Sequence, residues 1–127
     1  MPKPTMTPCR AHPGTERLVA DVARDGRRAA VLAAVLKTLG HPVRLRILAL
    51  LLGREEGTVS EICAALGLSQ AGASQQLAAL RLHGLVGVRR DGGFRHYAVA
   101  LPVVGDLIGC LARCYVEHGS RLQHNVG

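Results

Sequence analysis

Short neutral side chains mark the segment SQAGASQQLAALRLHGLV (residues 69–86), whose leucine pattern is typical of a helix. Gln70, Ser74 and Gln75 lie where a surface helix usually has lysine and glutamate. Glutamine can bond adenine through two groups, serine can bond several base edges, and the major groove is only about 12 Å wide. We therefore predict that these three residues read bases in DNA. Ser69 is the expected helix cap, with the helix N-terminus directed at a phosphate.

Three arginines, Arg89, Arg90 and Arg95, flank a short glycine-containing turn that follows this helix. We predict that they contact DNA phosphates or the minor groove. On this prediction, Arg89→Ala weakens binding to all DNA and reduces its dependence on salt. The alternative for the whole region is an ordinary surface helix beside a solvated charged turn.

Cys110 and Cys114 are four residues apart in the segment CLARC. On a helix their Cβ atoms would lie roughly 5–6 Å apart, farther than the distance of about 3.8 Å that a disulfide prefers. Two thiolates at this spacing can hold a soft ion, because metal–sulfur bonds are about 2.3 Å or longer. Trivalent arsenic or antimony suits such a site, with a third ligand from Cys9 or a second subunit. Asp106 and His118 continue the same helical stripe.

Two other interpretations of these cysteines stay open. The protein could sense persulfides or oxidants, with one thiol pairing across subunits or with Cys9. The cysteines could also be inert residues of an interface. Cys63, between Ile62 and Ala64, is expected to be a small buried residue.

The composition favours an acidic partner. The chain has 127 residues, with 16 Lys and Arg against 9 Asp and Glu, a net charge of +7 and a pI near 10.1. Nucleic acid is the first candidate partner and a membrane surface the second, although arginine-rich usage can also reflect codon bias. The length predicts one domain, with a core that must be aliphatic because Phe94, Tyr97 and Tyr115 are the only aromatic residues.

Location and enzyme chemistry can be judged from what the sequence lacks. It has no apolar run of the about 18 residues that span a bilayer, and its start, MPKPTMTPCR, does not resemble a signal peptide. We expect a cytoplasmic protein with no membrane partner, in which cysteines stay reduced. We find none of the motifs that would indicate an enzyme: a glycine-rich phosphate loop, a Gly-x-Ser-x-Gly motif, or paired carboxylates on one helix face. No obligatory cofactor is expected.

Helical patterns and turn residues define the expected elements. Residues 1–15 hold four of the six prolines and are predicted to be a flexible arm. Helices are expected over residues 15–26, 27–39, 42–53, 58–66 and 70–82. Thr15 is the expected cap of the first helix, His41 precedes the third, and Ser60 is the expected cap of the fourth. The expected inward residues of these helices are Val31, Val35, Leu36, Leu39, Leu45, Leu48, Leu51, Leu52, Ala73, Leu77 and Leu80.

The order of the elements predicts a winged helix. Gly67-Leu68-Ser69 is the three-residue turn of a helix-turn-helix, and β-type runs on both sides of Asp91-Gly92-Gly93 indicate a hairpin wing. A helix from Pro102 has Val104, Leu107, Ile108 and Leu111 on its apolar side and is expected to pair with a second protomer. The fold class is therefore mainly α, over residues 16–123, with a two-stranded wing, a C-terminal dimerisation helix and a tail at 124–127.

The segments LKTLGHPVRLRILALLL, VSEICAALGLSQAGASQQLAALRLHGLV and RRDGGFRHYAV resemble the ArsR/SmtB family of winged-helix repressors. The resemblance covers residues 29 to about 118. It implies a homodimer that binds double-stranded DNA at an inverted-repeat operator and leaves it when an inducer binds. The family's terminal helices pair in the dimer, as proposed above for residues 102–122.

Family members bind inducers at several places, and most of these are altered here. The Cys-x-Cys pair of one branch corresponds to Thr58 and Ser60, and the Asp-x-His pair of a zinc-binding branch to Leu101 and Val103. A thiol-sensing branch has a cysteine where this chain has Ala49. We therefore predict a repressor released by a thiol-binding inducer, As(III) or Sb(III), at Cys110 and Cys114. A persulfide- or oxidant-responsive repressor is the alternative, and a divalent soft-metal sensor ranks behind both.

Overall fold

The computed structural model describes residues 14–123, which fall into two compact units that divide after Ala34. Most of the predicted arm, including Cys9, and the predicted tail at 124–127 lie outside the described residues. Among the described helices, none combines the length and apolar character that crossing a bilayer needs.

The first unit contains α1 (Thr15–Arg24) and the beginning of α2 (Gly26–Leu39). Thr15 is not the cap of α1 as predicted, because it already lies inside the helix and Gly14, at φ 88°, precedes it without a side-chain cap. The helix also ends before Gly26. Asp25 separates the two helices, and its Oδ1 accepts the backbone N–H groups of Arg27 and Arg28 at 3.0 and 3.1 Å. An acid therefore caps α2, which the hydrophobic pattern alone did not indicate.

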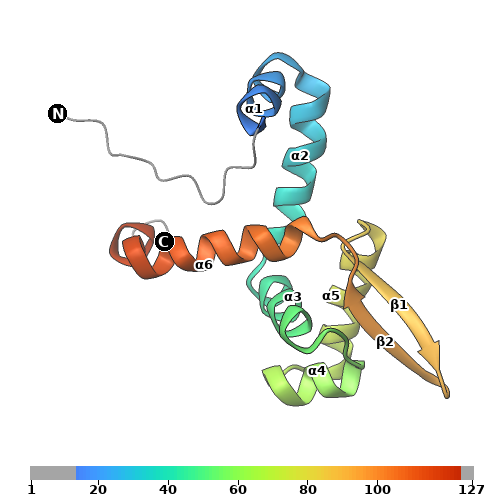
Figure 1. The fold of residues 1–127 in the computed structure, drawn as a ribbon. Coiled ribbons are helices and arrows are strands. Elements are labelled where there is room, and N and C mark those ends of the chain that lie inside the picture. The colour runs from blue at the N-terminus through green and yellow to red at the C-terminus, as the bar shows by residue number, and fades with distance from the viewer. Residues whose placement is uncertain (1–13, 124–127) are drawn as a thin grey trace. The chain divides into compact units, whose positions relative to one another are not determined.

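In the second unit, the end of α2 is followed by three helices: α3 (Pro42–Arg54), α4 (Val59–Leu66) and α5 (Gln70–Leu82) (Figure 1). His41 caps α3 as expected, with its Nδ1 accepting the Val43 N–H at 3.2 Å. The predicted cap Ser60 is wrong, because Thr58 and Glu61 form a reciprocal capping box at the start of α4. The capping box satisfies two free backbone donors at once, whereas Ser60 would start the helix two residues late.

The hairpin consists of β1 (Val86–Asp91) and β2 (Phe94–Val99). Asp91 pairs with Phe94, so the turn is only Gly92-Gly93, and both glycines have positive φ. This is the backbone that a two-residue hairpin requires and that glycine adopts most easily. A bridge between Gly57 and Tyr97 then attaches β2 to the turn between α3 and α4. The base of the wing is therefore held by backbone hydrogen bonds.

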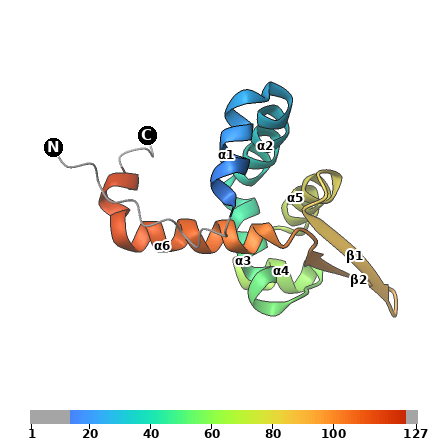
Figure 2. The same cartoon turned by 45° about the horizontal axis from the view of Figure 1, so that its top comes forward.

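The C-terminal helix α6 (Val103–Gln123) follows the wing and packs on α3. Its apolar side starts buried at Val104, becomes half-buried at Leu107 and Ile108, and is 59% exposed at Leu111. Figures 1 and 2 show its C-terminal half extending beyond α3, α4 and α5. Within the second unit, that half has no described element to cover it, and the backbone leaves helical geometry at His118.

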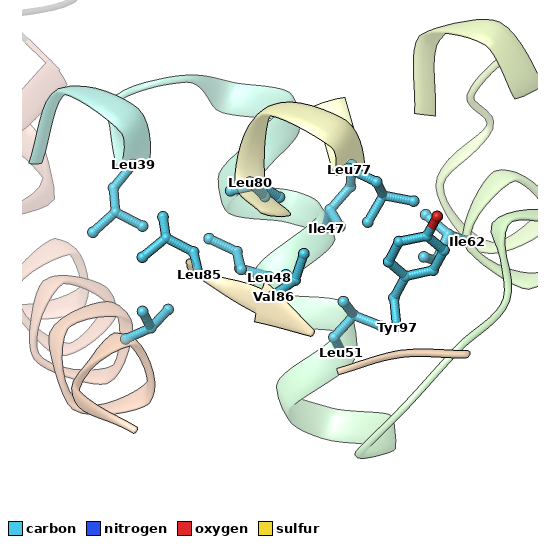
Figure 3. Packing of buried hydrophobic residues seen from close by; sticks show 11 residues of the cluster. Leu39, Ile47, Leu48, Leu51, Ile62, Leu77, Leu80, Leu85, Val86 and Tyr97 are labelled. Carbon is cyan, nitrogen blue, oxygen red and sulfur yellow. The ribbon is translucent and has the colours of Figure 1, made fainter. Parts of the chain in front are cut away.

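One aliphatic core holds the second unit together (Figure 3). It joins the inner faces of α3 and α5 with Ile62 of α4, Val86 and Tyr97 of the wing, and Val104 of α6. The predicted inward residues Leu48, Leu51, Ala73, Leu77 and Leu80 are buried. Leu52, Val31 and Leu36 are exposed instead, and Ile47, which the pattern did not single out, is fully buried. Five of the 13 residues of α3 are leucines and they lie on more than one side of the helix, so the leucine pattern alone did not define one inward face.

Candidate nucleic-acid interface and thiol site

The turn before α5 fixes the start of that helix. Gly67 ends α4 with φ 67°, a left-handed conformation that glycine adopts without steric cost, and its N–H reaches the Cys63 carbonyl at 2.9 Å. Ser69 then caps α5 as predicted, because its Oγ accepts the Gly72 N–H at 3.0 Å. A Cβ at Gly72 would lie 2.9 Å from that Oγ. A glycine therefore keeps this cap intact and the first turn of α5 slim.

The outer face of α5 is polar and accessible. Gln70, Ser74 and Gln75 are exposed, whereas the inward-facing residues of the same helix, such as Ala73 and Leu77, are fully buried. The structure thus places the three predicted base-reading residues on one helix, outside the core. Over the first half of α5, these neutral side chains leave that face free of the bulk that would prevent close approach to a groove.

Gln76 has a different role from its neighbour Gln75. Its Oε1 accepts a hydrogen bond from Arg44 Nε at 2.8 Å, and the Arg44 guanidinium also donates to the Thr38 carbonyl at 3.2 Å. One arginine therefore joins the end of α2, α3 and α5 within the second unit. The sequence shows two adjacent glutamines, and only their position on the helix separates the exposed one from the anchoring one.

Arg89 has carboxylate partners that the sequence analysis missed. Its guanidinium forms a two-pronged pair with Glu56, with Nη2 to Oε1 at 2.7 Å and Nε to Oε2 at 3.3 Å, and it also contacts Asp91 at 3.3 Å. The hydrogen bond from Arg89 lowers the pKa of Glu56, and the same bond raises the pKa of Arg89. Glu56 is 33 residues away in the chain, so no local pattern indicated this pair. The predicted DNA contact of Arg89 stays a prediction, and these partners weigh against it.

Arg90 and Arg95 are in a different setting. They are directly opposite each other on β1 and β2, next to the turn, and both are exposed. In the described part of the chain neither has an ion pair. Two like charges directly opposite each other repel and destabilise the hairpin. A bound anion would reduce that repulsion.

Cys110 and Cys114 lie one turn apart on α6, and both are half-buried reduced thiols. The predicted helical spacing is therefore present. Asp106 is exposed on the preceding turn, and His118 lies at the kink with its Nε2 3.9 Å from Glu117 Oε2. Within residues 14–123, no three His, Cys, Asp or Glu side chains gather closely enough to hold a metal ion. Cys63, on α4, is half-buried rather than buried.

A helix-turn-helix with a paired-strand wing, an accessible polar second helix and basic wing residues defines a winged-helix DNA-binding protein. A helix-turn-helix domain model matches residues 39–89. Over 76 residues the chain is 41% identical to the HTH-type transcriptional regulator Rv0081 of Mycobacterium tuberculosis, covering 60% of this chain and 67% of the relative. The chain belongs to the ArsR/SmtB family of winged helix-turn-helix transcriptional regulators.

Two solved structures show the same fold. Reduced HlyU from Vibrio cholerae is 36% identical, with a TM-score of 0.65 over 71% of this chain and 94% of that one. The antimony-specific transcriptional repressor AntR is 26% identical, with a TM-score of 0.68 over 76% of this chain and 86% of that one. The predicted winged helix-turn-helix fold is thus confirmed.

Proposed function

We propose that this regulator is a repressor that reads its operator with Gln70, Ser74 and Gln75 and leaves it when an inducer binds Cys110 and Cys114. The observation that carries the DNA-reading part is the division of α5 into a fully buried leucine and alanine face and an exposed glutamine and serine face. Ser69 and the helix N-terminus bind a phosphate, and Arg90 and Arg95 add phosphate or minor-groove contacts.

The active form is a homodimer that binds an inverted repeat. Leu111 and Tyr115 leave an apolar stripe more than half exposed on α6, at 59% and 53%. A second copy of α6 covers that stripe, because a paired helix removes the same residues of both copies from water. The two α5 helices then enter successive major grooves about 34 Å apart.

The inducer is As(III) or Sb(III), bound by the thiolates of Cys110 and Cys114. These residues are one turn apart and half-buried on α6, where two sulfur ligands favour a soft ion. The similarity to a repressor described as antimony-specific supports this choice. A third ligand would come from Cys9 or from the second protomer.

A persulfide- or oxidant-responsive repressor is the second candidate. The same thiols favour it, as does the likeness to HlyU, whose solved structure is described as reduced. In that case a thiolate would attack the outer sulfur of a persulfide and release the donor thiol, or an oxidant would oxidise the thiols. Neither reaction needs a bound ion. Sensing of a divalent soft metal ranks behind both.

Release from DNA follows from the position of α6. This helix packs on α3, and α3 packs on α5, so a shift of α6 reaches the base-reading helix through one intermediate element. Ion binding between two residues of α6 changes how that helix pairs with its twin and hence the spacing of the two α5 helices. Coupling free energies between such sites are typically about 1–3 kcal/mol.

The experiment is a DNA-binding titration with a duplex that the wild-type protein selects from a random-sequence library. Arsenite, antimonite, cadmium, zinc and a persulfide donor are added separately, and fluorescence anisotropy reports release. We expect arsenite or antimonite to release wild type and Cys63→Ser but not Cys110→Ser/Cys114→Ser. Normal release of that double variant by arsenite or by antimonite would refute the inducer site. Release of wild type by the persulfide donor alone would favour the second candidate.

A further inference from the structure

A groove lies between α5 and the wing. Its lining residues come from the outer side of α5, the start of α4 and strand β2: Val59, Ser74, Ala78, Arg81, Leu82, Arg95 and Tyr97. Ser74 is one of the base-reading residues proposed above, so the groove adjoins the surface that would face DNA. Leu82 is 83% exposed, which leaves this edge of the groove open to a large partner.

The charges of the groove have one sign. Arg81 from α5 and Arg95 from β2 contribute two guanidinium groups, and none of the lining residues is acidic. Val59, Ala78, Leu82 and Tyr97 provide the apolar part of the lining. Arginine binds phosphate oxygens with a planar fork of donors, and the apolar carbons of deoxyribose can contact the aliphatic side chains beside it.

The two faces of the hairpin separate its arginines. Side chains alternate along a strand, and directly paired residues point to the same face. Arg90, its partner Arg95 and the core residue Tyr97 therefore share the face toward the groove, while Arg89 and its partner His96 share the opposite one. On that opposite face Glu56 already occupies the fork of Arg89 and lies 4.0 Å from His96 Nδ1.

We propose that the groove between α5 and the wing receives the sugar–phosphate backbone of one DNA strand, bound by Arg81 and Arg95, while Arg89 makes no contact with DNA. The proposal rests on the DNA-reading function above and adds Arg81 to its binding residues. Arg89 instead braces the wing against the turn between α3 and α4, beside the backbone bridge from Gly57 to Tyr97. This reverses the sequence-based expectation for Arg89→Ala.

The test compares two substitutions of the same type, Arg81→Ala and Arg89→Ala, in the full chain. Affinity for the library-selected duplex is measured by anisotropy at several salt concentrations. Each lost phosphate contact reduces the slope of log K against log salt by about 1 per protomer. We expect that reduction for Arg81→Ala and the wild-type slope for Arg89→Ala. Arg81→Lys keeps the charge and is expected to keep the slope.

Other results would overturn the proposal. An unchanged salt slope for Arg81→Ala would show that Arg81 makes no phosphate contact in the groove. A reduced salt slope for Arg89→Ala would show that DNA contacts the other face of the wing. Either result, with wild type binding the duplex, leaves the proposed repressor function standing. Failure of the wild-type chain to bind any duplex sinks both. Circular dichroism melts of each variant separate a lost contact from a lost fold.

Discussion

At the scale of single residues, adjacent side chains of the same type have separate roles. Gln75 is exposed on the outer face of α5, whereas Gln76 Oε1 accepts a hydrogen bond from Arg44 Nε. The same holds for Arg89 and Arg90 on β1. Side-chain type predicted an exposed polar face on α5, which the structure has, but the role of each residue depends on which face of its element it occupies.

Substitution of the two glutamines tests this division. We expect Gln76→Ala to lower the free energy of unfolding by about 1–2 kcal/mol, because a hydrogen bond to a charged, half-buried arginine is lost. Gln75→Ala is expected to change it by less than about 0.5 kcal/mol, but to alter which DNA sequence the protein selects. Urea denaturation and selection from a random library measure the two effects. Equal stability losses would contradict the assignment.

Glu56 makes the stability of the fold depend on pH. Its pKa is lowered in the folded state, first by the hydrogen bond from Arg89. A carboxyl with a lowered folded pKa stabilises the fold above its ordinary value of 4.5 and loses that contribution as pH falls through the folded value. We expect Glu56→Gln to melt below wild type at pH 7, with the difference in Tm shrinking below pH 4.5. A difference that is the same at every pH would argue against the pair.

At the scale of elements, helix ends and turns decide where the surface that we propose to read DNA is placed. The sequence located the helix-turn-helix turn and the hairpin well, because Gly67, Gly92 and Gly93 have clear local signatures. It was less successful for helix starts and for inward faces. Thr58 and Ser60 are both good caps in isolation, and the choice between them depends on the reciprocal bond from Glu61.

The capping box allows a matched test. Thr58→Ala removes the side chain that accepts the Glu61 N–H at 3.2 Å, and we expect a loss of about 1 kcal/mol in the free energy of unfolding. Ser60→Ala is the control, since it changes a similar side chain two residues further on and is expected to be nearly neutral. Chemical denaturation of both variants measures this. A larger loss for Ser60→Ala would restore the original prediction.

At the scale of the whole molecule, the apolar stripe of α6 at Leu111 and Tyr115 is exposed in a single chain, and a second chain would cover it. We expect wild type to be a dimer and Leu111→Glu/Tyr115→Glu to be a monomer, because each protomer would place two charges in an apolar contact. Arg113→Gln, elsewhere on the same helix, is the control and is expected to stay dimeric. Light scattering after size-exclusion chromatography measures the mass, and a monomeric wild type would refute the pairing.

The fold as a whole could be predicted from order and spacing, whereas the long-range contacts could not. Gly57 reaches Tyr97, Glu56 reaches Arg89 and Arg44 reaches Gln76, each between segments that are distant in the chain. Such pairs depend on how the elements pack, so the residue pattern within one element does not predict them. They add to the aliphatic core in holding the wing and α5 to the rest of the second unit.

The strict two-residue turn of the wing has a consequence for comparing homologues. Because strand side chains alternate, a shift of one position in the pairing would exchange Arg89 with Arg90 between the two surfaces of the ribbon. A single misplaced gap in an alignment would then match Arg89, which pairs with Glu56, to the arginine that we propose contacts DNA, and would match Arg90 to the supporting one. Conservation scores in this segment therefore carry meaning only after the turn length of each homologue has been matched.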